Sequence, residues 1–259
     1  MKYNLLQAVC TIFLFVLAVS CKKDNNSTNN NQTGNGSLVR IQQGTDPNIS
    51  FDTVFLINYD ASSHISSIVD SLYKDTLFVT SNAAGNPVSV TETYGFSATY
   101  IYDVTGVLTQ VDYTLAGSHE QDIFEYSNGV ISKRTHNSNL GSGPVSIQGS
   151  YTYTVAGGNI TDIKEYDLNG SFVKETTCTY GTETNAFKPL SLLNLGNIMG
   201  TENFLNLETY FNKNMLAGFS INGDAVSNAY STYSSQEIVR VVSTDYINFY
   251  LFTWLLSYK

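Results

Sequence analysis

The sequence predicts an all-β fold in which an antiparallel meander of repeated β-hairpins forms a strongly curved sheet or an open half-barrel. One observation is a recurring segment that reads aromatic, Asp, short turn, Gly, aliphatic, clearest in YIYDVTGVLTQVDY at 100–113. A second is that the runs on either side of each turn alternate with period two, as half-buried strands do. Looser copies of the segment lie at residues 57–71, 78–93, 124–137, 151–166 and 164–177.

The turn positions have simple physical roles. Three turns begin with an aspartate whose carboxylate is expected to accept a hydrogen bond from the backbone two residues on: Asp60, Asp103 and Asp167. Glycine permits the positive φ that tight hairpin turns require. It stands at Gly106, Gly129, Gly158 and Gly170, and Ser63 takes this place in the first copy.

The alternation stops after residue 182. Residues 187–207 carry many apolar side chains without a strand period, and Pro189 restricts the residue before it. We therefore expect a short helical or irregular apolar insert at 187–207 that lies on the concave face of the sheet. Strand-like patterns then return and continue to the end of the chain.

The N-terminal segment is typical of export rather than of a fold. Residues 1–20 combine Lys2 with an apolar stretch from Leu5 to Val19, followed by small residues and Cys21. This segment resembles a bacterial lipoprotein signal peptide, which implies acylation of Cys21, with palmitate as a typical chain, and anchoring in a membrane. Residues 21–37 are polar and Asn-rich and predict a disordered tether. Residues 38–259 are then expected to form a single β-repeat domain.

The Y-x-Y-D-x-x-G units resemble the YD or RHS-type repeat. With the signal peptide and the tether, the layout is similar to that of uncharacterised Tyr-rich β-repeat lipoproteins of Bacteroidota. The resemblance implies architecture and a place in the cell envelope, and it carries over no catalytic element. Three Asp–Ser/Thr–apolar tripeptides also resemble the O-glycosylation acceptor motif of that group, which makes Thr53, Ser71 and Thr76 candidate acceptors.

Charge and cysteine content exclude several classes of function. The chain has 22 acidic against 13 basic residues, a net charge of −9, which argues against binding nucleic acid. Cys178 is the one cysteine left in the expected domain, so no internal disulfide is predicted, and a buried apolar role is expected for it. His64, His119 and His136 are expected in separate turns or loops, away from metal-ligand spacing, so we expect no metal and no cofactor.

These patterns predict a non-catalytic outer-membrane lipoprotein, monomeric, with a binding or scaffolding role towards an envelope protein, a glycan or a lipid. Whether it faces the periplasm or the cell surface is left open. An alternative is a carrier of a lipid or acyl chain in the concave face of an unclosed barrel. A third is a glycan-binding or glycan-hydrolysing protein, for which the acidic pairs are Glu120 with Asp122 and Asp162 with Glu165. Charge is ordinary at strand ends, so no enzyme is expected.

Overall fold

The computed structural model is described for residues 37–44, 52–71, 74–93, 95–115, 117–139, 146–185, 187–193, 207–221, 224–232, 238–245 and 250–258. The predicted signal peptide, Cys21 and nearly all of the predicted tether lie outside these residues. So does much of the expected insert.

Nearly all of the regular structure is β-strand. The strands of the first half are β1 (Leu38–Gly44), β2 (Asp52–Tyr59), β3 (Ile65–Asp70), β4 (Asp75–Ser81), β5 (Pro87–Glu92), β6 (Ser97–Tyr102), β7 (Leu108–Leu115) and β8 (Ser118–Ser127). Those of the second half are β9 (Val130–Asn139), β10 (Ser146–Ala156), β11 (Asn159–Asp167), β12 (Phe172–Thr184), β13 (Asn214–Ile221), β14 (Asp224–Thr232), β15 (Ile238–Asp245) and β16 (Tyr250–Tyr258). Between β12 and β13 lie the helix α2 (Lys188–Ser191) and the 3₁₀ helix η1 (Leu207–Phe211).

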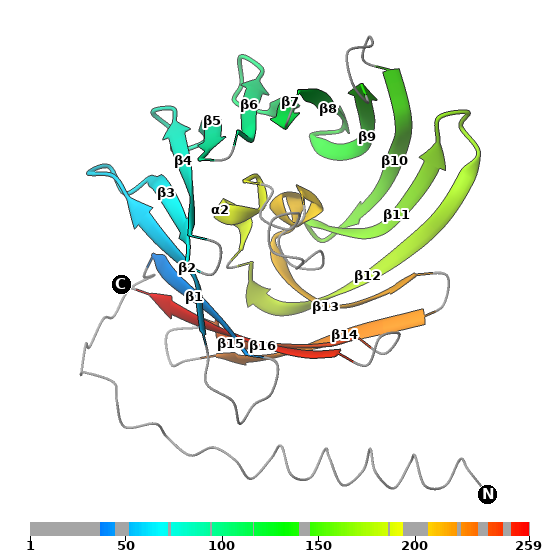
Figure 1. Ribbon diagram of the computed structural model, residues 1–259. Helices are drawn as coiled ribbons and strands as arrows, with labels where there is room; N and C mark the ends of the chain where they lie inside the picture. The colour runs from blue at the N-terminus through cyan, green and yellow to red at the C-terminus, as the bar shows by residue number, and fades with distance from the viewer. Residues whose placement is uncertain are drawn as a thin grey trace, which may run out of the picture. The chain divides into compact units, whose positions relative to one another are not determined.

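Each strand pairs antiparallel with the next in the chain, so the predicted all-β meander is confirmed. The expectation of an open or half-barrel is corrected on one point. Strand β1 pairs with β16, from Leu38 opposite Tyr258 to Gly44 opposite Thr253, and the strand order returns to its start as a closed barrel (Figure 1). The sheet closes because residues 38–44, LVRIQQG, form a strand that pairs with both β2 and β16. This segment carries no turn motif, so the hairpin pattern did not predict it.

Side chains alternate between the inside and the outside of the barrel. In β4, for example, Leu77 is fully buried while its neighbour Phe78 is 56% exposed. The inward set forms one hydrophobic core that includes Ile41, Phe55 and Val111. Burying each such side chain stabilises the fold by roughly 1.5–3 kcal/mol.

The hairpin turns use the aspartates as acceptors. In the β6–β7 turn, Oδ1 of Asp103 accepts from the backbone N–H of Thr105 (2.8 Å) and of Val107 (3.0 Å). Asp60 and Asp167 accept in the same way from the residues two and four places on. Gly106 has φ +85°, and Ser63 adopts φ +64° in the first turn. The aspartate therefore accepts from the backbone of its own turn, and the last residue of the turn takes a left-handed conformation.

The tyrosine that precedes a turn has a second role, at the rim of the barrel. The hydroxyl of Tyr102 donates to the carbonyl oxygen of Pro87, the first residue of the neighbouring strand β5 (2.8 Å). Tyr59 and Tyr126, which also precede turns, donate to Leu38 and Leu108, and Tyr180, within β12, donates to Ile160, each at 2.6 Å. The repeat thus places a row of side-chain bonds between neighbouring strands along one rim, where the backbone ladders end.

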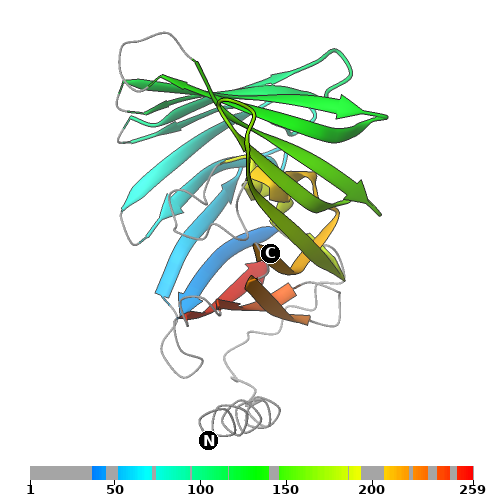
Figure 2. The ribbon, with the colours of Figure 1, turned by 90° about the vertical axis from the view of Figure 1, so that its right-hand side faces the viewer.

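The apolar insert lies inside the ring of strands, as Figures 1 and 2 show for α2. Leu190, Leu192 and Leu193 are at most 2% exposed and belong to the same core as the wall. The hydroxyl of Tyr100 on β6 donates to the carbonyl oxygen of Leu192. The described parts of the insert, α2 and η1, therefore agree with the helical apolar insert expected from the sequence.

We predict that Tyr102→Phe lowers the free energy of unfolding by about 1 kcal/mol, since it removes the hydroxyl donor and leaves the Pro87 carbonyl without it. Urea denaturation measures this change. Tyr166→Phe is the control, because that hydroxyl donates to no described residue, and it should cost less than half as much. Equal effects of the two variants would contradict a special role for the rim tyrosines.

Candidate binding site

The insert is held against the barrel wall by buried charge. Arg134 on β9 places Nη2 2.9 Å from Oε1 of Glu208 on η1, and Nη1 3.6 Å from Oδ2 of Asp122 on β8. These side chains are 14%, 13% and 5% exposed, so the ion pairs lie largely out of water. Both carboxylates raise the pKa of Arg134 against the opposing effect of its burial. A charged group on the insert is thereby tied to two strands of the wall.

Further groups complete this cluster. The guanidinium of Arg134 lies 4.1 Å from the ring centroid of Tyr151, and the hydroxyl of Tyr153 donates to Glu208 (3.1 Å). His136 places Nδ1 3.1 Å from Asp122, and this hydrogen bond raises the pKa of the imidazole against the effect of its burial. The sequence suggested a loop for His136, whereas it lies in β9 with its side chain turned inward. A residue-by-residue reading missed the cluster because its members are far apart in the chain.

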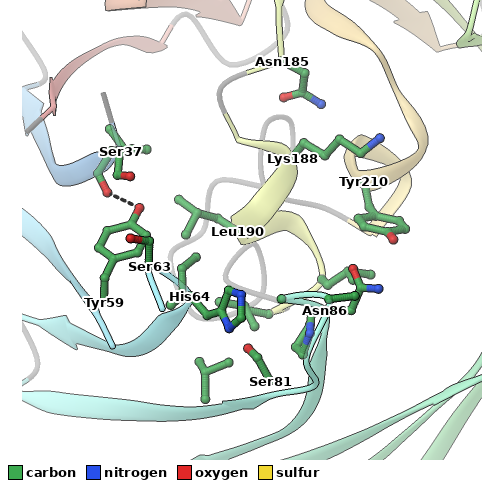
Figure 3. A pocket seen from close by; sticks show the side chains of 18 of the residues that line it. Ser37, Tyr59, Ser63, His64, Ser81, Asn86, Asn185, Lys188, Leu190 and Tyr210 are labelled. Carbon is green, nitrogen blue, oxygen red and sulfur yellow. Dashed lines mark hydrogen bonds between the residues drawn. The ribbon is translucent and has the colours of Figure 1, made fainter. Parts of the chain in front are cut away.

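A pocket of about 600 Å³ remains between the insert and the wall formed by β1 to β5. Figure 3 shows Lys188 and Leu190 of the insert on one side, and Tyr59, His64 and Ser81 of the wall on the other. This volume is in the range of small-molecule sites. Its apolar lining includes Leu38, Ile65, Val79, Pro87, Leu190, Leu192 and Leu193.

The charged groups of the pocket are basic. No Asp or Glu is among the described residues that line it, although the chain as a whole has a net charge of −9. Lys188 is exposed and holds its ammonium 5.5 Å from the ring centroid of Tyr210. His64 lies 3.8 Å from Asp60, a carboxylate that already accepts two backbone N–H groups of its own turn. The pocket therefore combines an apolar floor with a cationic edge.

A second group of acids lies at the opposite rim, where β3 turns into β4. Asp75 is 4% exposed and shares a hydrogen bond with Glu92. That hydrogen bond, partial burial and the charge of Asp75 raise the pKa of Glu92 to about 7. Below about pH 7 Glu92 therefore carries a proton that it shares with Asp75.

The acidic pairs singled out from the sequence are not brought together for catalysis. Asp122 is bound to Arg134 and His136, while Glu120 is exposed near the start of β8. Asp162 and Glu165 are three residues apart in β11 and so lie on opposite faces of the sheet. Within the part of the chain that the structure describes, no group of His, Cys, Asp and Glu could hold a metal ion.

The remaining predicted residues are placed as follows. Cys178 is half-buried in β12, and burial raises the pKa of its thiol to about 11, which leaves it unreactive at neutral pH. Ser71 is exposed in the turn after β3, and Thr76 is half-buried in β4. The side chain of Thr53, like Cys21, lies outside the described structure. The O-glycosylation of these residues stays a prediction.

Similarity to known proteins is limited to the fold. No protein-family model and no curated protein matches the chain. Among solved structures, a porin-like protein from Bacteroides uniformis ATCC 8492 superposes with a TM-score of 0.58 at 13% identity, over 86% of this chain and 96% of the other. A porin-like protein from Bacteroides vulgatus ATCC 8482 gives 0.55 at 12% identity, over 87% and 99%. At these identities the likeness shows a shared β fold.

Among the described residues, no helix is both long and apolar enough to cross a lipid bilayer.

We predict that Arg134→Met lowers the free energy of unfolding by about 3 kcal/mol, because it leaves two buried carboxylates without their cation. Glu208→Gln should cost slightly less. The double variant should cost about 1–3 kcal/mol less than the sum of the two single variants, because the ion pair is already broken once either partner is replaced. A double-mutant cycle in urea measures this coupling.

The control for that cycle is Lys133→Met, which breaks an exposed ion pair of 3.1 Å with Glu125. Such pairs contribute at most about 1 kcal/mol. Additive costs in the cycle, or a large cost in this control, would contradict the assignment of Arg134 as the link between insert and wall.

We predict that Glu92→Gln raises the melting temperature at pH 8, by about 2 °C, and leaves it nearly unchanged at pH 5. The pKa of Glu92 is raised in the folded protein from 4.5 to about 7, so the folded state binds this proton more tightly than the unfolded state does. Stability is therefore lost as the pH rises from about 4.5 towards 7, and a neutral amide avoids that loss.

Thermal unfolding from pH 5 to pH 8 provides the measurement. Glu125→Gln on the outer wall is the control and should not alter the slope. A difference between Glu92→Gln and the unmodified protein that stays constant with pH would contradict the shared proton.

Proposed function

We propose that this chain is a non-catalytic lipoprotein of the cell envelope that binds a small ligand in the pocket at the barrel rim. The observation that carries the proposal is the pocket of about 600 Å³ between α2 and strands β1 to β5. The anchor rests on the signal peptide and on Cys21, and the barrel supplies the binding domain.

The side chains on the outer face of the barrel favour a domain that lies in water beside the membrane. Outward positions on the described strands include Thr99, Lys133 and Lys164, and the two lysines form ion pairs with outward glutamates. A barrel wall that faces lipid carries a continuous apolar band instead. The exposed apolar side chains here, such as Phe78 and Ile147, alternate with polar ones along their strands.

The contents of the barrel narrow the choice of ligand. A carrier of long acyl chains needs a hollow interior, whereas the core cluster and the insert fill much of the concave face. We therefore place binding at the rim pocket, and we favour a ligand smaller than a two-chain lipid. A glycan hydrolase is disfavoured, since the acidic pairs are either held by cations or on opposite faces of the sheet.

One experiment tests both parts of the proposal. The full chain, expressed with its signal peptide in a bacterium that processes lipoproteins, is measured by denaturing and by native mass spectrometry. The denatured mass should correspond to residues 21–259 plus acyl chains, and the native mass should be higher by one releasable small molecule. Cys21→Ser is the control and should lose the acyl mass.

The experiment can disprove the lipid anchor and the ligand independently of each other. A mature mass that begins at another residue, or that lacks acyl chains, would overturn the anchor. Identical native and denatured masses would count against a ligand that is retained through purification.

A further inference from the structure

The pocket lies where one rim tyrosine is missing. In the pairs β2–β3, β6–β7 and β8–β9 the register shifts at the last or next-to-last residue before the turn, and in β12–β13 it shifts at Tyr180, before the insert. The residue at the shift carries the rim side chain. It is tyrosine in β2, β6, β8 and β12, and every one of these hydroxyls donates to the start of the neighbouring strand. In β4 the shifted residue is Ser81, in β10 it is Val155 and in β14 it is Thr232.

The serine leaves the room that a phenol ring takes elsewhere. Ser81 lines the pocket together with Tyr59 of the preceding hairpin and Pro87 opposite. Ile65, the first residue of β3, also lines it and stands where Leu38, Pro87 and Leu108 accept from tyrosines in the other hairpins. The pocket is thus a gap in a periodic row of side chains.

At Val155 the surroundings differ from those of Ser81. There the chain after η1 comes against the turn, where Lys213 N–H donates to the carbonyl oxygen of Gly158 (3.0 Å). Asn212 accepts from the N–H of Ile160 at 2.7 Å. In β10 the chain after η1 therefore lies against the turn that follows Val155, whereas Ser81 in β4 lines an open pocket.

The edge of this gap is suited to an acid. Lys188 has no carboxylate within ion-pair distance among the residues that the structure describes, and its one charged contact is with the ring of Tyr210. His64 also lines the pocket, and its ring packs over Gly85, where an added Cβ would lie 2.8 Å from Cδ2. Among the described residues of the lining, an anion would find the ammonium of Lys188, the imidazole of His64 and no carboxylate.

We propose that the ligand of this pocket is an anionic amphiphile, whose apolar part fills the place of the missing tyrosine at Ser81 and whose acid group lies at Lys188. This inference rests on the proposed function and names the class of its ligand. The leucines of the insert supply the contact surface for the apolar part. An aliphatic carboxylic acid and an aromatic sulfonate both have the required chemistry.

Two fluorescent probes test the proposal because they differ by one sulfonate. 8-Anilino-1-naphthalenesulfonate is the anion, and N-phenyl-1-naphthylamine is its neutral counterpart. Lys188→Gln should weaken binding of the anion about fivefold and change that of the neutral probe less than twofold. Lys213→Gln is the matched control, an exposed lysine on the same rim, and should change neither.

Ser81→Tyr tests the location. The new ring should fill the gap and weaken binding of both probes at least tenfold, and its hydroxyl should raise the melting temperature by donating to Ile65. Unchanged binding of both probes by a folded Ser81→Tyr variant would overturn the pocket itself. Loss in Ser81→Tyr with no selective effect of Lys188→Gln would leave the pocket standing and overturn the anionic class.

A measurement on the unmodified protein keeps the test independent of variant folding. Dodecanoate should displace N-phenyl-1-naphthylamine at about fivefold lower concentration than dodecanol does. Equal displacement would overturn the preference for an acid, and no displacement by either would overturn an amphiphile as ligand.

Discussion

The ladder between β1 and β16 is the constraint on which the rest of the structure depends. It joins two segments more than two hundred residues apart and leaves no free edge in the sheet. Closure with so many strands has a cost, because a ring of this size is too wide to be filled by the side chains of its own wall. The chain meets this requirement with the segment between β12 and β13, whose leucines join the core and whose Glu208 is held by Arg134. The pocket is what the wall and the insert leave between them.

The tyrosines of the repeat stabilise the rim of the barrel, where the backbone pairing ends. A hairpin ends where its ladder ends, and the last carbonyl groups of neighbouring strands then lack partners from the backbone. A tyrosine before the turn reaches back to one of these carbonyls while its ring packs on the core, so a single residue type serves both needs. Where the repeat substitutes a small residue, as at Ser81, both the bond and the ring are lost, and a site becomes available without any change of the backbone.

Much of the fold could be predicted from local patterns, since Asp103, Gly106 and the alternation around them specify a hairpin within a few residues. Closure could not, because the pairing of Leu38 with Tyr258 is set by the accumulated tilt and register of all the strands between them. The candidate site could not be predicted from the sequence for a similar reason. Arg134, Glu208 and Asp122 meet only in the folded barrel, and the importance of Ser81 appears only against the register of its neighbours.

The joining of first strand to last also shapes how the molecule assembles. Every other pair of strands is joined by a short or moderate connection and is able to form as its part of the chain emerges, whereas β1 has to wait for β16. During that interval both outer strands present unpaired N–H and C=O groups, which other chains are able to bind. Contacts between such distant segments are slow to form. A polypeptide of this design is thus most vulnerable to misassembly in its last moments of folding, and protection at that stage, by a chaperone or by slow delivery, would benefit it most.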